Sequence, residues 1–149
     1  MKSLFNTGDN NELIQRIERL TPNSPAEWGK MNVAQMLSHV QEPIKIAFGE
    51  VKLKQSFIGI LFGRMAKKKM LQGEGLTKNL PTAPSFLRKD DRNFEEEKSK
   101  LISYVKAFAT KGADGITKDT HPFFGKLTTT EWDVLGWKHL DHHLRQFGV

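Results

Sequence analysis

Apolar residues recur at intervals of three and four in several stretches of the chain, which is the spacing of one face of an α-helix. The first stretch covers residues 10–20 and ends before a proline-containing segment. The second follows Asn32, whose side chain suits a helix N-cap, and continues to Gly49. Pro43 lies inside this helix and lacks the N–H that would bond to the carbonyl of His39. We therefore expect the helix to bend beside His39.

Two further helices are predicted in the second half of the chain. Residues 93–110 begin with three consecutive glutamates, which the positive end of a helix dipole favours, and Gly112 ends the helix. Residues 128–147 start with Thr128 and Glu131, the spacing of a capping box. No stretch alternates with the period of two that is typical of a strand. The pattern predicts an all-α fold, with an antiparallel four-helix bundle as the simplest way to bury these stripes.

The middle of the chain adds a short extra helix and a long loop to this bundle. Residues 57–71 mix apolar and basic side chains, and we expect an amphipathic helix with its basic face in water. Residues 73–84 contain glycine and proline at several positions and predict a loop, longer than most, that packs over a site or a partner. With 149 residues in all, we expect a single domain spanning residues 1–149.

The formal net charge of +6 comes from the basic excess in residues 51–90. Besides a solvated face, this excess is compatible with a surface for an anion, a nucleic acid or a membrane. No nucleic-acid recognition module accompanies it, so nucleic acid is not expected as a partner. Because a small bundle would not fully cover the apolar side chains of residues 57–71, we expect a homodimer through this surface.

The chain contains no cysteine, which excludes disulfides, a cysteine nucleophile and metal sites built on thiolates. Polar residues follow Leu4 and Phe5 at once, so no signal-peptide stretch is present. The longest apolar run, residues 57–63, is far shorter than the roughly 20 residues that span a bilayer. We therefore expect a cytoplasmic protein without membrane insertion. Because cysteine is absent, histidines and carboxylates remain as the candidate metal ligands.

Histidines are concentrated in the last predicted helix. His139 and His143 are one turn apart and about 40° apart around the helix axis, so both rings can reach one metal ion. They continue the inward stripe of Leu135, whereas His142 is turned toward the flank by about 100° from His143. The alternative is that these rings fill the core or form local hydrogen bonds. We favour His139 and His143 as a ligand pair.

A third ligand is expected from His39, which lies between the apolar residues Met36 and Val40. Three imidazoles without a fourth protein ligand describe an open site of the catalytic type, suited to zinc, nickel, iron or copper. Glu42 is a candidate to orient a ligand, with an exposed helical glutamate as the alternative. Asp141 should face solvent. The motifs of di-iron bundles, zinc proteases, nucleotide-binding loops and serine hydrolases are absent.

Several motifs together resemble the DinB-like superfamily. They are His-Pro-Phe-Phe-Gly-Lys-Leu-Thr from His121, Trp-Lys-His-Leu-Asp-His-His-Leu-Arg-Gln-Phe-Gly from Trp137, and Met-Asn-Val-Ala-Gln-Met-Leu-Ser-His upstream. The resemblance spans nearly the whole chain and is closest to a branch of uncharacterised bacterial proteins. It implies an up-down-down-up four-helix bundle with a divalent metal ion held by His39, His139 and His143. Relatives often have His-His-Arg-Gly-Gln where this chain has His-His-Leu-Arg-Gln, so their substrate contacts do not transfer directly.

Some DinB-like proteins are metal-dependent transferases or isomerases that use low-molecular-weight thiols. The resemblance therefore implies a metal-dependent transferase that activates a small thiol or a similar nucleophile and acts on a small-molecule substrate. His121 and His142 are candidates for the rim of such a site. The alternative is a non-enzymatic stress-related or binding protein, in which the metal site is structural or vacant.

Overall fold

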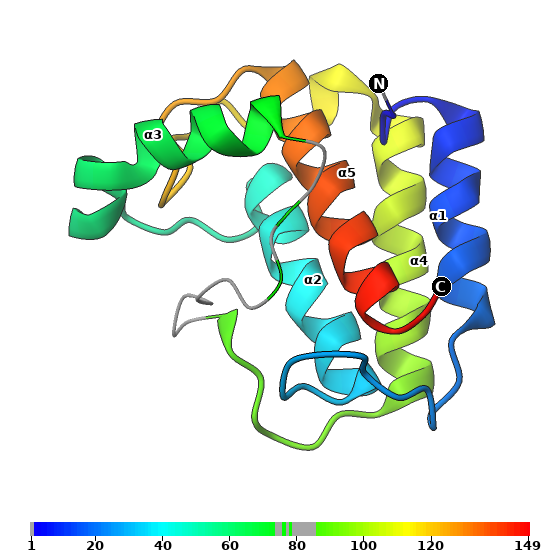
Figure 1. The fold of residues 1–149 in the computed structure, drawn as a ribbon. Coiled ribbons are helices and arrows are strands. Elements are labelled where there is room, and N and C mark those ends of the chain that lie inside the picture. The colour runs from blue at the N-terminus through cyan, green and yellow to red at the C-terminus, as the bar shows by residue number, and fades with distance from the viewer. Residues whose placement is uncertain (1, 74–75, 77, 79–85) are drawn as a thin grey trace.

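This computed structural model describes residues 2–73, 76, 78 and 86–149 (Figure 1). Within these residues the fold is all-α, as predicted, and contains no strand. The expected loop at residues 73–84 falls almost entirely outside the described residues. The helices are α1 Thr7–Arg19, α2 Val33–Ala47, α3 Phe57–Gln72, α4 Phe94–Lys111 and α5 Thr129–Gln146, with a 3₁₀ turn, η2, at Ala113–Gly115.

Helices α1, α2, α4 and α5 form a four-helix bundle, and α3 projects from one end of it (Figure 1). In Figure 1, α1 and α5 run downward, whereas α2 and α4 run upward. The largest contacts are those of α4 with α1 and α2, followed by the contact between α2 and α5. This is the up-down-down-up order, and it places α2 antiparallel to α5. None of the described helices combines the length and the hydropathy that crossing a bilayer requires.

Capping interactions set the helix boundaries close to those that the sequence predicts. Asn32 and Gln35 form a capping box at the start of α2, as Thr128 and Glu131 do at the start of α5. Gly112 ends α4 with a φ of +60°, a backbone conformation that residues other than glycine rarely adopt. α1 is the exception, because it begins three residues earlier than expected, behind an Asn6 cap.

The core lies between the four bundle helices. Its fully buried large side chains are Leu13 and Ile17 of α1, Met36, Leu37 and Val40 of α2, Leu101, Val105 and Phe108 of α4, and Leu140 and Leu144 of α5. The buried amide of Asn10 donates to the carbonyls of Leu4 (2.8 Å) and Val105 (2.7 Å), which connects α1 to the N-terminal segment and to α4. Both N–H groups of the Asn10 side chain therefore have a hydrogen-bond acceptor.

One polar expectation is wrong, because Asp141 does not face solvent. Its carboxylate accepts a hydrogen bond from Arg16 at 2.8 Å, and both side chains are largely buried between α1 and α5. Arg16 also donates to the carbonyl of Val149 at 3.0 Å. The guanidinium therefore holds the end of α5 and the C-terminal residue against α1, and a buried cation of this kind requires the carboxylate beside it.

The structure decides which face of α3 turns toward the rest of the molecule. The face that α3 turns to the rest of the molecule carries Gly59 and Gly63 rather than its large apolar residues. A Cβ atom on Gly63 would lie 1.9 Å from the carbonyl oxygen of Phe123, and one on Gly59 would lie 2.8 Å from the carbonyl oxygens of Pro122 and Phe123. The helix approaches the loop at residues 122–124 so closely that only glycine fits, and its apolar side chains remain outside.

Candidate metal centre

The structure brings His39, His139 and His143 together at the contact between α2 and α5. One ring nitrogen of each residue lies within 4.8 Å of the corresponding nitrogen of the other two. The ring centroids are 4.7 Å apart for His39 and His143, 4.7 Å for His139 and His143, and 5.2 Å for His39 and His139. The pair on α5 meets because residues four apart share a helix face, and the antiparallel packing of α2 brings the third ring to the same level.

The protonation of two of these rings follows from their outer partners. Nδ1 of His39 lies 2.9 Å from the carbonyl oxygen of Phe86, which can only accept a hydrogen bond, so this Nδ1 carries the proton. Nδ1 of His143 likewise lies 2.8 Å from Oε1 of Gln146 and donates to it. In a neutral imidazole the other nitrogen is then unprotonated. The Nε2 atoms of His39 and His143 thus meet at 3.1 Å as two lone-pair acceptors.

The orientation of Gln146 is itself determined by the chain that precedes α2. Its Nε2 donates to the carbonyl oxygen of Trp28 at 2.6 Å, which leaves Oε1 as the atom that faces His143. Gly29 makes room for this amide, because a Cβ atom there would lie 2.5 Å from Nε2 of Gln146. Gln146 and Trp28 therefore hold the His143 ring in the tautomer whose Nε2 points into the cluster.

Burial keeps the three rings neutral. It is the largest cause of the lowered pKa of His143, which is about 3, and the neighbouring charge of His39 contributes in the same direction. Burial also lowers the pKa of His39, against the hydrogen bond to Phe86, and lowers the pKa of His139 well below its ordinary value. Neutral imidazole is the form that binds a metal ion, so the cluster is in its binding-competent state at neutral pH.

His139 differs from the other two rings in its surroundings. It is partly exposed, whereas His39 and His143 are buried. Among the described residues its ring contacts His39 and His143 and forms no hydrogen bond.

His142 lies outside the group, on the side of α5 that the helix geometry predicts for it. Its ring is 5.6 Å from the ring of Trp28. Burial lowers the pKa of His142, and a hydrogen bond to the backbone of Leu76 opposes this change. These contacts place His142 next to Trp28 and Leu76, where it flanks the cluster without joining it.

His121 is held within its own loop. Its Nδ1 accepts hydrogen bonds from the backbone N–H groups of Phe123 and Phe124, both at 3.0 Å, and its ring lies 5.1 Å from that of Trp132. Burial lowers the pKa of His121 to about 4. The ring thus shapes the turn against which α3 packs, and it is not part of the three-histidine group.

Glu42 faces cations and does not contact the ring of His39. Its carboxylate lies 2.8 Å from both Lys45 and Arg88. Burial alone would raise the pKa of Glu42, but the hydrogen bonds and charges of Lys45 and Arg88 lower it below its ordinary value. The three charges border a polar pocket of about 660 Å³ between α2 and α4, behind the face of α2 that carries His39.

The interpretation of the sequence missed two residues of this site, Phe86 and Gln146. The carbonyl of Phe86 is a backbone group, so its role depends only on where the chain returns to α2. Gln146 could be suspected because residues three apart on a helix are neighbours, which places it beside His143. Its partner at Trp28 is remote in sequence and follows only from the packing.

The chain was compared with known protein families, curated proteins and solved structures. No curated protein and no solved structure matches it. The sequence model of a family of proteins of unknown function, DUF1569, matches residues 2–148. Since this match spans nearly the entire bundle, including all three clustered histidines, the chain belongs to the DUF1569 family.

Proposed function

We propose that His39, His139 and His143 bind one divalent metal ion. The observation that carries the proposal is the 3.1 Å approach of two unprotonated nitrogens, Nε2 of His39 and Nε2 of His143, in a buried environment. Two lone pairs at this distance repel each other unless a cation lies beside both. The outer partners of both rings prevent the repulsion from being relieved by a change of tautomer.

The spacing of the His39 and His143 rings fits a first-row metal ion. Two nitrogen ligands about 2.1 Å from one ion are separated by about 3.0–3.4 Å at octahedral or tetrahedral angles. The distance between His39 and His143 lies in this range. Zinc, nickel and iron all accept three neutral imidazoles, and the absence of cysteine disfavours ions that require thiolates.

Membership of the DinB-like superfamily is part of the same proposal. It is supported by the up-down-down-up order of the bundle and by the placement of the three histidines on its second and last bundle helices. It is also supported by the motifs around His121 and His139 in the sequence.

The activity that this arrangement supports best is a metal-dependent transferase acting on a small thiol or a similar nucleophile. A divalent ion held by three imidazoles retains a coordination position at which a thiol is deprotonated and held as a thiolate. The protein contributes the two buried, preoriented rings of His39 and His143, and His139 as a third, partly exposed ligand residue. Because the chain has no cysteine, it has no thiol of its own for this chemistry.

The burial of the site also supports a second candidate, a non-enzymatic protein with a structural metal ion. His39 is 3 % exposed and His143 is 9 % exposed. A closed site of this kind would connect α2 to α5 and stabilise the bundle.

Elemental analysis of protein purified without a histidine tag or added metal tests the proposal. We expect one divalent ion per chain, and consumption of glutathione when the loaded protein is mixed with glutathione and an alkyl halide. The His39→Ala variant is the control and should lose both. Bound metal without turnover would favour the structural site, and a wild-type protein that binds no metal from added zinc, nickel or iron would contradict both candidates.

A further inference from the structure

Helix α3 exposes far more apolar surface than a bundle of this size normally does. Six of its large apolar side chains are between 51 and 74 % exposed. They are Phe57, Ile58, Ile60, Leu61, Phe62 and Met65. Single exposed apolar residues are ordinary, but a continuous cluster indicates a surface that another apolar phase covers.

The position of α3 does not depend on these side chains. Its inner face rests on the loop at residues 122–124 through Gly59 and Gly63, and the N–H of Ser56 donates to the carbonyl of Pro122 at 2.9 Å. At the other end, Lys138 of α5 donates to the carbonyls of Met70 and Leu71. Since both ends are held by polar contacts, the apolar face is presented outward by a defined framework.

All charged side chains in and just before α3, residues 51–73, are positive. Residues 51–73 contain no aspartate or glutamate. Lys52 pairs with Asp119, and Lys67 pairs with Glu131. The other exposed cations of the region form no ion pair within the described part of the chain: they are Lys54, Arg64, Lys68 and Lys69. The exposed apolar cluster is thus accompanied by cations that have no acidic partner among the described residues.

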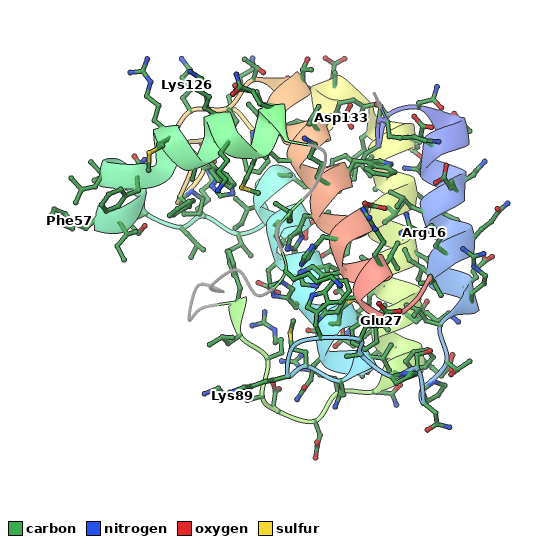
Figure 2. The ribbon with its side chains drawn as sticks, in the orientation of Figure 1. Arg16, Glu27, Phe57, Lys89, Lys126 and Asp133 are labelled. Carbon is green, nitrogen blue, oxygen red and sulfur yellow. The ribbon has the colours of Figure 1, made fainter. Side chains whose placement is uncertain are left out.

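Apolar side chains dominate the outer part of α3, residues 57–65, in which Arg64 is the only cation. Phe57 lies at the outer end, away from the bundle (Figure 2), and the cluster ends at Met65. Lys68 and Lys69 follow on the part of the helix that is nearer to α5. A surface that is apolar at its tip and basic behind it matches the order of layers in a bilayer, where acyl chains lie below the phosphates.

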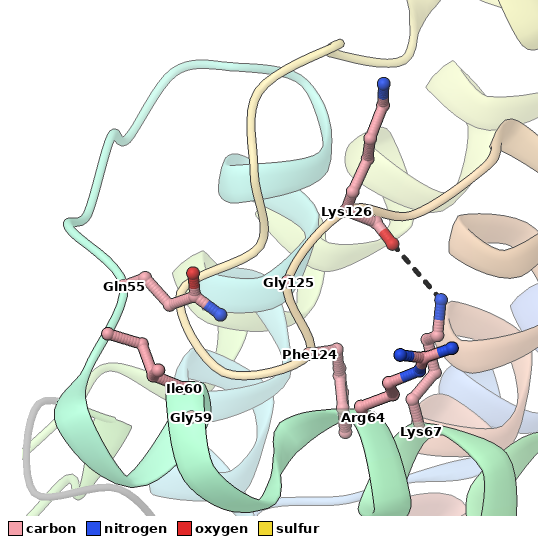
Figure 3. A pocket seen from close by; sticks show the side chains of 8 residues that line it. All are labelled: Gln55, Gly59, Ile60, Arg64, Lys67, Phe124, Gly125 and Lys126. Carbon is pink, nitrogen blue, oxygen red and sulfur yellow. Dashed lines mark hydrogen bonds between the residues drawn. The ribbon is translucent and has the colours of Figure 1, made fainter.

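A cationic pocket lies beside this face. It has a volume of about 270 Å³ and separates α3 from residues 124–126 (Figure 3). Arg64, Lys67 and Lys126 are among the residues that line it, and none of its lining residues is acidic. Figure 3 shows Lys67 donating to the carbonyl of Lys126, at 3.1 Å, while Arg64 extends next to it. Because Lys67 is also paired with Glu131 and the ammonium group of Lys126 points away from α3, Arg64 is the cation that this pocket offers to a phosphate headgroup (Figure 3).

We propose that the outward face of α3 docks on the surface of an anionic phospholipid bilayer, with Phe57, Leu61 and their apolar neighbours inserted at the boundary of the acyl chains. A second copy of this chain is the less favourable occupant. Antiparallel packing of two α3 helices would place the tip of one against Lys68 and Lys69 of the other, and parallel packing would bring the same cations together. Neither arrangement supplies an acidic side chain from residues 51–73 to neutralise these cations. The anionic headgroups of a bilayer do neutralise them.

Sedimentation with vesicles tests this docking surface on the full chain. We expect the protein to sediment with vesicles of equimolar phosphatidylcholine and phosphatidylglycerol, and not with vesicles of phosphatidylcholine alone. Added salt should weaken the binding, because part of the attraction is electrostatic. The proposal is independent of the metal site, so the His39→Ala variant should bind the anionic vesicles as the wild type does.

Two double variants separate the apolar and the charged contributions. Phe57→Ser with Leu61→Ser should reduce the affinity for anionic vesicles by about tenfold or more, since each removes a side chain whose insertion is favourable. Arg64→Glu with Lys68→Glu should reduce it by about tenfold or more as well. The matched control, Lys106→Glu with Lys118→Glu, makes the same change in net charge at exposed positions elsewhere and should bind nearly as the wild type does.

Equal sedimentation with both kinds of vesicle, or with neither, would overturn the proposal. It would also be overturned if light scattering showed a dimer that Phe57→Ser with Leu61→Ser converts to a monomer while vesicle binding is unchanged. In that case a second copy would be the occupant of the α3 face. The replaced side chains are exposed and outside the core, so circular dichroism of both double variants should match that of the wild type.

Discussion

The Nε2 atoms of His39 and His143 meet at 3.1 Å while both Nδ1–H groups donate to fixed acceptors elsewhere. This relationship distinguishes the cluster from a set of histidines that merely fill a core. Core histidines are satisfied by pairing a donor with an acceptor, whereas these two rings present an acceptor to an acceptor. The predictions for the site follow from this arrangement.

Replacement of His39, His139 or His143 by alanine should each abolish tight binding of one metal ion per chain. A site that loses one of three imidazoles keeps two, which are too few to hold the ion against water or buffer. His142→Ala is the matched control, because it removes a neighbouring histidine outside the group, and it should retain the ion. Isothermal titration calorimetry with zinc measures the affinity and the number of bound ions for each variant. If His142→Ala lost the ion while His143→Ala kept it, the ligand assignment would be wrong.

Replacement of Gln146 should weaken metal binding without removing a ligand. Gln146→Leu frees the His143 ring from its outer acceptor, and losses of this kind cost about 10- to 100-fold in affinity. Gln146→Glu retains an acceptor for Nδ1 and should bind more tightly than Gln146→Leu. Arg145→Leu, at the adjacent exposed position, is the control. Competition with a chromogenic chelator gives the affinities, and equal affinities for Gln146→Leu and wild type would contradict the positioning role.

Gly63→Ala should release α3 from the loop at residues 122–124. Alanine in place of glycine would by itself stabilise a helix by about 1 kcal/mol. The new Cβ would however lie 1.9 Å from a backbone oxygen of Phe123, which cannot turn away as a side chain does. The steric clash should therefore dominate, and amide hydrogen exchange in α3 should become faster. Ile60→Ala, on the exposed side of the same helix, should leave the exchange unchanged, and slower exchange in Gly63→Ala would show that the loop yields instead.

His121 should make the folded state less stable in mild acid. Its pKa is lowered from 6.5 to about 4 by burial, so between these values the unfolded chain binds a proton that the folded chain does not. The contribution of His121 to the free energy of unfolding is therefore fully present above pH 6.5 and is lost as the pH falls toward 4. The loss from this residue is about 3 kcal/mol at most.

The variant His121→Asn tests this dependence, because its side-chain oxygen can still accept from Phe123 and Phe124 but does not titrate. Urea unfolding at pH 7 and pH 4.5 should show a smaller loss of stability for His121→Asn than for the wild type. The other histidines are common to both proteins and cancel in the comparison. The same loss in both would mean that His121 is protonated within the fold.

The helices and their ends could largely be predicted because their determinants are local. Asn32 with Gln35, and Thr128 with Glu131, cap their helices through contacts within one turn, and Gly112 ends α4 through its own backbone conformation. An antiparallel bundle followed from the apolar stripes, whereas the order of its helices was expected only from the resemblance to the DinB-like superfamily. The orientation of α3 did not follow from the stripes, because it depends on how closely Gly59 and Gly63 approach a loop that lies about 60 residues later in the chain.

The sequence by itself determined the pair His139 and His143, since the helical repeat places residues four apart on one face. It also indicated His39 through its apolar neighbours. Only the tertiary structure decided the tautomers, because the acceptors at Phe86 and Gln146 are set by where the chain returns to α2 and by the carbonyl of Trp28. Local patterns specify which side chains share a face, whereas the partner of each nitrogen depends on contacts between segments far apart in the chain.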